Sequence, residues 1–309
     1  MPKFQENVSL AGFSNYKIGG PAKFFFEAKN QQDVAWAVGE AKKLGERVFI
    51  LGGGTNLLIS DDGFNGLVLK PSLNFIEADG EMLMAGAGVL MFELLDFSVA
   101  KGLSGLEWAG GLPGTLGGAI RGNAGAFGRE IKENIIQVES IDTNNAERHT
   151  RNNQECGFGY RNSIFKELNG GEVILSAFLK MEIGDAAAIK KIMQEKIDYR
   201  LSRQPLDYPN IGSIFKNVPV ELVSPEVLKD CADVIKQDPF PIVPAARLIG
   251  LAGLKRTARG GAMISEKHGN FIINTGGATA ADVKYLIDLV KKKIKDKFGI
   301  TLEEEVQLL

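Results

Sequence analysis

The chain has 309 residues, of which 44% are hydrophobic and 24% are charged. These proportions are typical of a globular protein with a sizeable core, and the length predicts one large or two medium domains. The formal net charge of −2 argues against a nucleic-acid-binding protein or a protein of anionic membrane surfaces, because both need a basic excess.

The sparse cysteines and histidines exclude further classes of protein. Cys156, Cys231, His149 and His268 are too few for a disulfide framework or for a Cys- or His-based metal centre, so no metal is expected. No apolar run reaches the ~18 residues of a membrane span, and the N-terminus lacks the pattern of a secretory signal. We therefore expect a cytoplasmic protein without a membrane partner.

The N-terminal part predicts a β-α-β unit. Residues 22–28 and 47–51 have strand patterns, and residues 31–44 predict a helix that ends at Gly45. The predicted inward face of this helix is Val34, Val38, Ala41 and Leu44.

Further elements follow in chain order. Residues 66–90 predict two short strands, and residues 91–101 predict a helix that ends at Gly102 and turns Phe92, Leu95 and Val99 inward. The later segments predict a hairpin at 135–141 and 146–150, a strand at 172–183 and a charged amphipathic helix at 186–203 that connects two domains.

The C-terminal part has strong local signals. Thr279 can cap a helix over 280–298 that ends at Gly299. A final strand over 300–309 alternates between an apolar and a polar face; its apolar side chains are Ile300, Leu302, Val306 and Leu308.

Glycine is unusually frequent: the chain has 37 glycines in 309 residues, or about 12%, whereas ~7% is typical. One cluster follows the predicted strand 47–51 and comprises Gly52, Gly53, Gly54, Thr55, Asn56 and Leu57. Glycines let successive backbone N–H groups converge on an anion, which predicts phosphate binding. The segment is neither a Walker A loop nor a GxGxxG helix start, and a tight turn without function is the alternative interpretation.

The second cluster occupies residues 106–128. Its small residues allow a planar ring or a pyrophosphate to lie against the backbone, although a structural loop is the alternative. The candidate contacts are Gly114, Thr115, Gly117, Gly118, Ala119, Asn123 and Gly125. Two such segments predict one long nucleotide with a phosphate end and a ring end.

Three further residues are candidates for chemistry. Arg161, in FGYRNS, presents a planar fork of donors suited to a carboxylate or oxyanion. Ser213, in GSIFKN, could donate a hydrogen bond or a proton, and Glu305 lies on the polar face of the last strand. Each of the three also has an interpretation without function. Arg161 could be a surface arginine, Ser213 part of a simple turn, and Glu305 a solvated carboxylate.

The order of these motifs resembles the UDP-N-acetylenolpyruvoylglucosamine reductase (UDP-N-acetylmuramate dehydrogenase) family of bacterial peptidoglycan synthesis, in its shorter second type. The matching stretches are SNYKIGGPA (14–22), VFILGGGTNLLISDDGFNGLVL (48–69), LEWAGGLPGTLGGAIRGNAGAFG (106–128), FGYRNSIF (158–165), RLSRQP (200–205), GSIFKN (212–217), GGAMISEKHGNFIINTGGATAADV (260–283) and FGITLEEEV (298–306).

The resemblance implies an α+β fold with an FAD-binding domain of the vanillyl-alcohol-oxidase type, made of two α+β subdomains, and a smaller C-terminal α/β substrate domain. The implied boundaries are 1–200 for the FAD-binding domain (subdomains about 1–65 and 66–200), 201–298 for the substrate domain, and 299–309 for a final strand that returns to the N-terminal subdomain.

The resemblance also implies reduction of UDP-N-acetylglucosamine enolpyruvate by NADPH through non-covalent FAD. The implied catalytic residues are Arg161, Ser213 and Glu305. FAD contacts are implied for both glycine clusters, with the first on the pyrophosphate, and substrate contacts for Lys216 and Asn217 and, more weakly, for Tyr160 and Gln204. No separate Rossmann site for NADPH is recognisable, so both substrates are expected to alternate at the flavin.

The chain departs from the family pattern in two segments. Residues 218–244 are roughly 20 residues longer than the family pattern and predict an added helix. The family's GLKG sequence is changed to GLKR at residues 253–256. Two other functions are alternatives: an FAD-linked oxidase of the same fold, and an inactive nucleotide-binding module. Neither His nor Cys occurs before His149, which disfavours a tethered flavin, and the presence of all three catalytic candidates disfavours an inactive module.

Overall fold

The computed structural model describes residues 2–237 and 240–309, which form two compact units. The first unit comprises the residues up to Val8, Ala22–Gly53 and Phe64–Arg200, and the second comprises Ser9–Pro21, Gly54–Gly63 and Leu201–Leu309. These limits differ from the sequence-based domain boundaries, because residues 9–21 and 54–63 make their contacts with the C-terminal third of the chain.

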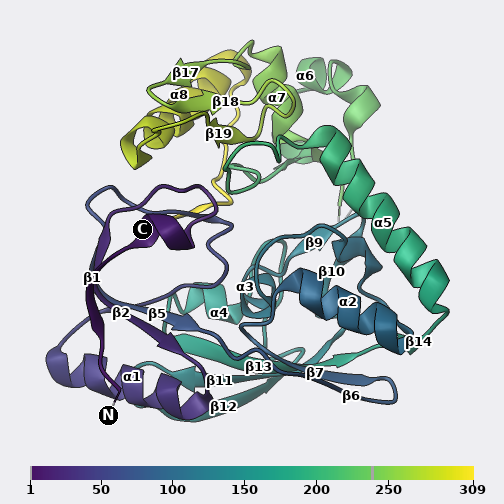
Figure 1. Cartoon of the computed structure of the whole chain (residues 1–309). Helices are drawn as coiled ribbons and strands as arrows, with labels where there is room; N and C mark the ends of the chain where they lie inside the picture. The colour runs from purple at the N-terminus through teal and green to yellow at the C-terminus, as the bar shows by residue number, and fades with distance from the viewer. Residues whose placement is uncertain (1, 238–239) are drawn as a thin grey trace. The chain divides into compact units, whose positions relative to one another are not determined.

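The first unit contains two main sheets, seen in Figure 1. A four-stranded sheet has the order β1-β2-β5-β3, and a five-stranded sheet has the order β12-β11-β13-β7-β6. The strands of these sheets are β1 (Gln5–Ser9), β2 (Pro21–Ala28), β3 (Val48–Ile50), β5 (Phe64–Pro71), β6 (Ile76–Asp79), β7 (Met82–Gly86), β11 (Ile135–Asp142), β12 (Arg148–Asn152) and β13 (Glu172–Lys180).

Helices and short strand pairs complete this unit. The helices are α1 (Gln31–Leu44), α2 (Met91–Lys101), α3 (Leu116–Arg121), α4 (Ile164–Glu167) and α5 (Ala186–Arg203), of which the last three residues of α5 belong to the second unit. The short pairs are β8 (Leu103–Ser104) with β14 (Glu182–Ile183), and β9 (Gly125–Ala126) with β10 (Arg129–Glu130).

The predicted β-α-β unit is confirmed. Strands β2 and β3 both pair with β5 in parallel, and α1 lies between them in the chain. The side chain of Asn30 accepts a hydrogen bond from the backbone N–H of Asp33 at the helix start, and Gly45 ends the helix in a left-handed conformation with φ 69°. Such a conformation has no steric cost for glycine, which is why the sequence located the end correctly.

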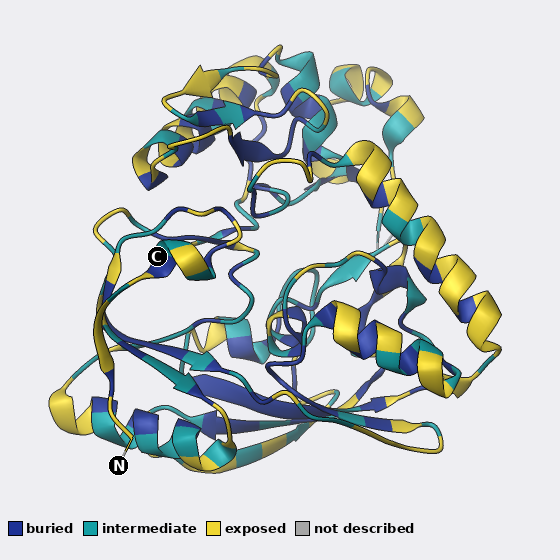
Figure 2. Cartoon of the chain, in the orientation of Figure 1, coloured by how far each residue is buried: buried dark blue, intermediate teal, exposed yellow. Residues whose placement is uncertain are grey.

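The central strands of the five-stranded sheet are largely buried (Figure 2). β13 pairs antiparallel with both β11 and β7, and eight of its nine residues are buried or half-buried. The predicted hairpin is also confirmed, because β11 pairs antiparallel with β12. This sheet supports the second glycine-rich segment, since Leu116 and Ile120 of α3 belong to the same core cluster as Ala177 of β13.

Three details of the prediction for the first unit were wrong. Residues 64–86 contain three strands rather than two. Phe92 is 58% exposed and Leu44 is 51% exposed, because the buried faces of their helices pass through Met91, Leu94, Leu95 and Ser98 in α2 and through Val34, Ala37, Val38 and Ala41 in α1. Each misplaced residue lies at the edge of an apolar stripe, where periodicity alone does not decide burial.

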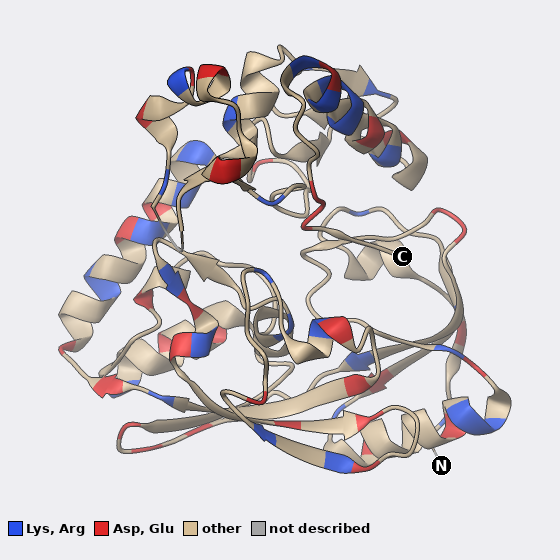
Figure 3. Ribbon diagram, turned by 180° about the vertical axis from the view of Figure 1, so that it is seen from behind, with Lys and Arg blue, Asp and Glu red and all other residues tan. Residues whose placement is uncertain are grey.

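The second unit packs α8 against a small sheet of order β17-β18-β19. Its elements are β4 (Leu57–Leu58), β15 (Val218–Pro219), α6 (Pro225–Lys229), β16 (Ile242–Val243), α7 (Ala245–Leu251), β17 (Ala258–Arg259), β18 (Ala262–Ile264), β19 (Ile272–Asn274), α8 (Ala280–Phe298) and β20 (Gln307–Leu308). The segment 218–244 contains a helix, α6, as predicted. Basic residues recur along α8, as Figure 3 shows.

Helix α8 has the predicted limits and caps. Thr279 accepts a hydrogen bond from the backbone N–H of Asp282, and Gly299 follows the helix with φ 73°. The carboxylate of Asp61 accepts further hydrogen bonds from the backbone N–H groups of Ala280, at 2.8 Å, and Ala281, at 3.1 Å. This cap explains part of why residues 54–63 belong to the C-terminal unit, because their polar groups complete the start of its long helix.

The final strand is shorter than predicted. Only Gln307–Leu308 forms β20, which pairs in parallel with β4, and Leu308 is 43% exposed. Ile300, Leu302 and Val306 are buried as expected.

Candidate active site

The two glycine-rich segments come together within the first unit. A Cβ atom on Gly53 would lie 2.7 Å from the Cα of Gly114, and one on Gly52 would lie 3.1 Å from Oγ1 of Thr115. Thr115 is itself fixed, because its Oγ1 accepts a hydrogen bond of 3.3 Å from the backbone N–H of Gly118. These close approaches require glycine at both positions, and they set two half-buried stretches of main chain with few side chains next to each other. Main chain of this kind is what a nucleotide cofactor needs in order to contact backbone N–H groups.

The rest of the first glycine segment belongs to the second unit. Gly54 has φ 63°, and a Cβ there would lie 2.1 Å from the carbonyl oxygen of Phe13. Nδ2 of Asn56 donates a hydrogen bond of 3.0 Å to the carbonyl of Glu305, and the Asn56 carbonyl accepts another of 3.0 Å from the N–H of Gln307. Asn56 therefore holds the chain that carries Glu305.

Arg161 occupies the tip of a tight hairpin in the first unit. Gly159 and Asn162 exchange backbone hydrogen bonds of 3.0 and 3.2 Å, and Tyr160 and Arg161 form the turn between them. The φ of Arg161 is 54°, a conformation that costs a non-glycine residue of order 1–3 kcal/mol and persists where neighbouring contacts impose it. Its Nη2 donates a hydrogen bond of 2.6 Å to the carbonyl of Gly125, so the guanidinium is tied to the second glycine-rich segment.

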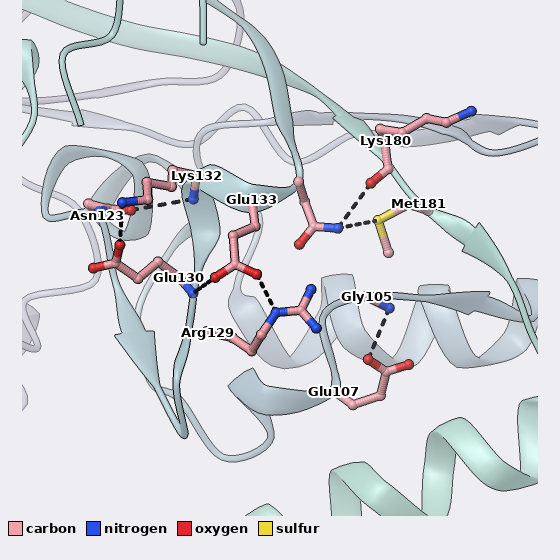
Figure 4. A network of polar contacts seen from close by, with 10 residues as sticks. Gly105, Glu107, Asn123, Arg129, Glu130, Lys132, Glu133, Lys180 and Met181 are labelled. Atoms are coloured by element: carbon pink, nitrogen blue, oxygen red, sulfur yellow. Dashed lines mark hydrogen bonds and ion pairs between the residues drawn. The ribbon is translucent and has the colours of Figure 1, made fainter. Parts of the chain in front are cut away.

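Asn123 holds this hairpin in place. The residue is fully buried; its Nδ2 donates to the carbonyl of Gly159 at 2.8 Å, and its Oδ1 accepts from the backbone N–H of Lys132 at 3.3 Å, an interaction drawn in Figure 4. Asn123 was predicted from the resemblance to contact the cofactor. The structure shows that its side-chain hydrogen bonds connect protein segments.

Two more side chains support the same hairpin. The hydroxyl of Ser163, which is fully buried, donates a hydrogen bond of 2.7 Å to the carbonyl of Arg121. Nζ of Lys166 donates a hydrogen bond of 3.0 Å to the carbonyl of Arg161. These contacts explain how the positive φ of Arg161 is maintained.

Ser213 and Glu305 are brought together within the second unit. The backbone N–H of Glu305 donates a hydrogen bond of 2.8 Å to the carbonyl of Ile214, the residue that follows Ser213. Phe215 forms an antiparallel bridge with Glu304. Segments that lie about 90 residues apart in the chain are thus adjacent, whereas Arg161 belongs to the other unit.

Asn270 fixes the segment that follows Ser213. Its backbone carbonyl accepts from the N–H of Ile214 at 2.9 Å, while its side-chain amide accepts from the N–H of Phe215 at 3.0 Å and donates to the carbonyl of Phe215 at 2.8 Å. Asn270 is 2% exposed. No role for Asn270 was predicted from the sequence, although its position inside the family-like stretch SEKHGNF was an available signal.

The four candidate substrate contacts have different surroundings. Lys216 forms an ion pair of 3.1 Å with Glu303, and Oδ1 of Asn217 accepts a hydrogen bond of 3.2 Å from the N–H of Ala245 at the start of α7. The guanidinium of Arg161 lies 5.2 Å from the ring centre of Tyr160. Gln204 is half-buried at the beginning of the second unit.

Arg200 is a buried charged residue that was not among the predicted site residues. Only 8% of it is exposed, and it lies on the same buried face of α5 as Ile189 and Met193. Its Nε donates a hydrogen bond of 2.8 Å to the carbonyl of Gly110, in the second glycine-rich segment. An arginine in register with the apolar stripe of a helix was the signal that could have identified it.

The first unit also contains a cavity of about 250 Å³ whose lining includes none of the predicted site residues. Glu107, Arg129, Glu133 and Asn134 are among its lining residues, and Arg129 forms an ion pair with Glu133 (Figure 4). In residues 2–237 and 240–309 no cluster of three or more His, Cys, Asp or Glu side chains is arranged to hold a metal ion. None of the helices described there combines the length and the apolar character that a membrane crossing requires.

Comparison with known proteins gives matches along nearly the whole chain. A family model described as "FAD binding domain" matches residues 22–150, and one described as "UDP-N-acetylenolpyruvoylglucosamine reductase, C-terminal domain" matches residues 204–309. A reductase of that name from Carboxydothermus hydrogenoformans is 40% identical over 98% of this chain and 93% of its own length. Another from Bacillus licheniformis is 38% identical over 99% of this chain and 94% of its own.

Solved structures agree with these matches. The crystal structure of UDP-N-acetylenolpyruvylglucosamine reductase from Thermus caldophilus has a TM-score of 0.78 and 29% sequence identity, over 99% of this chain and 98% of that one. The resemblance inferred from the motifs is thereby confirmed, together with the α+β fold and the FAD-binding domain. The chain belongs to the UDP-N-acetylenolpyruvoylglucosamine reductase family.

Proposed function

We propose that this protein reduces UDP-N-acetylglucosamine enolpyruvate to UDP-N-acetylmuramate with NADPH and non-covalently bound FAD, as a step in peptidoglycan precursor synthesis. Membership of the reductase family along almost the full chain supports this reaction. The structural observation that carries it is the hydrogen bond from Arg161 to Gly125. This hydrogen bond connects Arg161, the residue best suited to bind a substrate carboxylate, to the second glycine-rich segment, which is suited to bind a nucleotide.

The glycine-rich segments fit FAD. Gly52 and Gly53 pack directly against Gly114 and Thr115, and glycine-rich main chain of this kind presents backbone N–H groups that suit the phosphates of a dinucleotide. Bound FAD supplies the hydride chemistry, by accepting hydride from NADPH and passing it to the substrate. No His or Cys precedes His149, which supports non-covalent attachment.

We assign Arg161 to the carboxylate of the enolpyruvyl group. Addition of hydride to the β-carbon leaves negative charge on the α-carbon and, through conjugation, on the carboxylate oxygens. A guanidinium fork placed at these oxygens stabilises the charge as it develops. The hairpin that carries Arg161 is held by several hydrogen bonds, which fixes the position of the guanidinium. Such rigidity is expected at a catalytic donor, because a misplaced donor stabilises the transition state far less.

We assign Ser213 to proton delivery at the α-carbon, with Glu305 beside it. A hydroxyl is a weak acid in water, but a carbanion-like intermediate is a strong base, so a positioned hydroxyl suffices. The backbone N–H of Glu305 donates to the carbonyl of Ile214, the residue after Ser213. Ser213 and Glu305 therefore lie on neighbouring stretches of backbone. Lys216, Asn217, Tyr160 and Gln204 remain proposed substrate contacts.

The test measures the two half-reactions of the Ser213→Ala variant separately by stopped-flow absorbance. We expect reduction of the bound flavin by NADPH to remain near the wild-type rate, and reoxidation by the enolpyruvyl substrate to fall by at least ~10². Ser224→Ala is the matched control, since Ser224 precedes α6 and its side chain makes no capping hydrogen bond. Equal losses in both half-reactions would refute the assigned role.

We further propose a cytoplasmic location with small-molecule partners and no nucleic-acid partner. The net charge of −2 and the low cysteine content support this. Retention on an immobilised nucleic acid at physiological salt, or recovery in the periplasmic fraction, would contradict it.

A further inference from the structure

Arg200 carries a buried positive charge that the protein only partly satisfies. Its Nε donates to the carbonyl of Gly110 at 2.8 Å, but its Nη2 is buried without any hydrogen-bond partner. In the part of the chain that the structure describes, no carboxylate forms an ion pair with it. Burial of a guanidinium without a counter-charge is costly, so a group of this kind indicates a missing anion.

The surroundings of Arg200 are aromatic and cationic. Its guanidinium carbon lies 5.5 Å from the ring centre of Phe127, and Nζ of Lys196 lies 4.8 Å from the same ring centre. Burial lowers the pKa of Arg200, and the charge of Arg161 lowers it further. Like charges drawn into one region destabilise each other unless an anion lies between or beside them.

Arg161 and Arg200 are anchored to the same glycine-rich segment. Arg161 donates to the carbonyl of Gly125, and Arg200 donates to the carbonyl of Gly110. The stem of Arg200 also lies against Gly111, where a Cβ would come within 3.1 Å of its Cδ. Rigid anchoring of this kind keeps the side chain from turning outward to water.

We propose that Arg200 forms an anion-binding site together with Arg161, and that its Nη2 donates to a delocalised oxyanion at the reaction centre. The inference rests on the proposed function, which supplies two anions of this chemistry. One is the N1–C2=O edge of the flavin, which gains negative charge on reduction. The other is the enolpyruvyl carboxylate of the substrate. Both are flat and accept paired N–H donors, which a guanidinium offers and a lysine does not.

Each source predicts a different measurable effect. A cation beside the flavin favours its reduced form, so loss of Arg200 would lower the midpoint potential of the bound cofactor. A donor to the carboxylate holds the substrate, so its loss would weaken substrate binding to the oxidised enzyme.

The experiment compares the holoenzyme with its Arg200→Met, Arg200→Lys and Lys191→Met variants. Lys191 is exposed on the same helix, so its substitution removes one positive charge without touching the site. The first readout is the midpoint potential of bound FAD, by equilibration with a redox dye. The second is the dissociation constant of UDP-N-acetylglucosamine enolpyruvate, from the perturbation of the oxidised flavin spectrum without NADPH.

We expect Arg200→Met to change at least one of these equilibria tenfold or more, which for the two-electron flavin couple is a shift of about 30 mV. Arg200→Lys should restore only part of the effect, because it returns the charge without the fork. A lowered potential assigns the flavin as the anion, and a raised dissociation constant with unchanged potential assigns the carboxylate.

The proposal is overturned if both Arg200 variants match Lys191→Met in both equilibria, including the case in which only their thermal stability falls. If Arg200→Met does not fold, the comparison of Arg200→Lys with the wild type decides, and identical values for these two overturn the proposal. Failure of the underlying function is separate: the wild-type protein would then bind no FAD or give no spectral response to the enolpyruvyl substrate.

Discussion

The two regions that carry the proposed catalytic residues are held in place by different means. In the first unit, Arg161 lies on a turn with positive φ, and the turn is held by the side chains of Asn123 and Lys166. In the second unit, the backbone beside Ser213 and Glu305 is held by main-chain hydrogen bonds together with three asparagine side chains. Asn270 makes two of these side-chain hydrogen bonds, both to Phe215, and Asn56 and Asn210 each make one, to Glu305 and Gly212.

The difference indicates how each region tolerates change. Main-chain hydrogen bonds survive most substitutions, because every non-proline residue provides them. A turn maintained against its conformational preference depends on particular side chains, so single substitutions near Arg161 can displace it. We therefore expect the Arg161 hairpin to be sensitive at several positions and the Ser213 segment to be sensitive chiefly at Asn270.

The largest effect is expected for Arg161→Met. Loss of a preorganised donor at developing charge typically costs about 10²–10³ in rate, or ~3–4 kcal/mol of transition-state stabilisation. Steady-state kcat with the enolpyruvyl substrate measures this loss, and the flavin content of the purified protein should not change. A decrease below tenfold would remove Arg161 from the proposed role.

Asn270→Ala tests the second region. The substitution leaves the buried N–H and carbonyl of Phe215 without their side-chain partner, which should lower the free energy of unfolding by about 3 kcal/mol. Urea denaturation of the apoprotein measures it, with Lys293→Ala on the surface of α8 as a control that should stay within ~0.5 kcal/mol. Equal midpoints for both variants would show that main-chain contacts suffice.

Asn123→Ala tests the first region. We expect a loss of about 2 kcal/mol in stability, because the Lys132 N–H loses its side-chain acceptor and the Gly159 carbonyl keeps only the N–H of Asn162. A fall in kcat should accompany it, since Arg161 is no longer held. Asn144→Ala, at an exposed position, should change neither property. Loss of stability with an unchanged kcat would mean that the hairpin does not depend on Asn123.

The smallest effect concerns pH and lies in the loop before Asn270. Burial, followed by the charges of Lys236 and Lys255, lowers the pKa of His268 to about 4, whereas an unfolded histidine titrates near 6.5. The unfolded chain therefore binds the proton first as pH falls. The contribution of His268 to stability is complete above ~6.5 and decreases towards pH ~4.

Between pH ~6.5 and ~5 this decrease should reach at most about 2 kcal/mol. Chemical denaturation across this range, with His268→Asn compared with the wild type, isolates the contribution. His149→Asn, which removes the other histidine, serves as the reference. Parallel pH dependences of His268→Asn and the wild type would contradict the expectation.

Local signals predicted the four longest helices accurately, whereas the short helices α3, α4 and α7 were not predicted. The limits of α1, α2 and α8 follow from caps and terminal glycines that lie within a few residues of each helix end. The burial of Phe92 and Leu44 was predicted wrongly, because positions at the edge of an apolar stripe depend on what packs against them. The ordered motifs predicted the family correctly, and the comparisons confirm it.

By itself, the sequence determined the class of cofactor, the family and the limits of the four longest helices, because these depend on residue types at short, regular spacings. Only the tertiary structure decided that residues 54–63 complete the C-terminal unit, that Asn123 supports the Arg161 hairpin, and that Arg200 is buried beside Gly110 with an unsatisfied guanidinium. These contacts join residues far apart in the chain, and their energy depends on packing and desolvation that no local pattern contains.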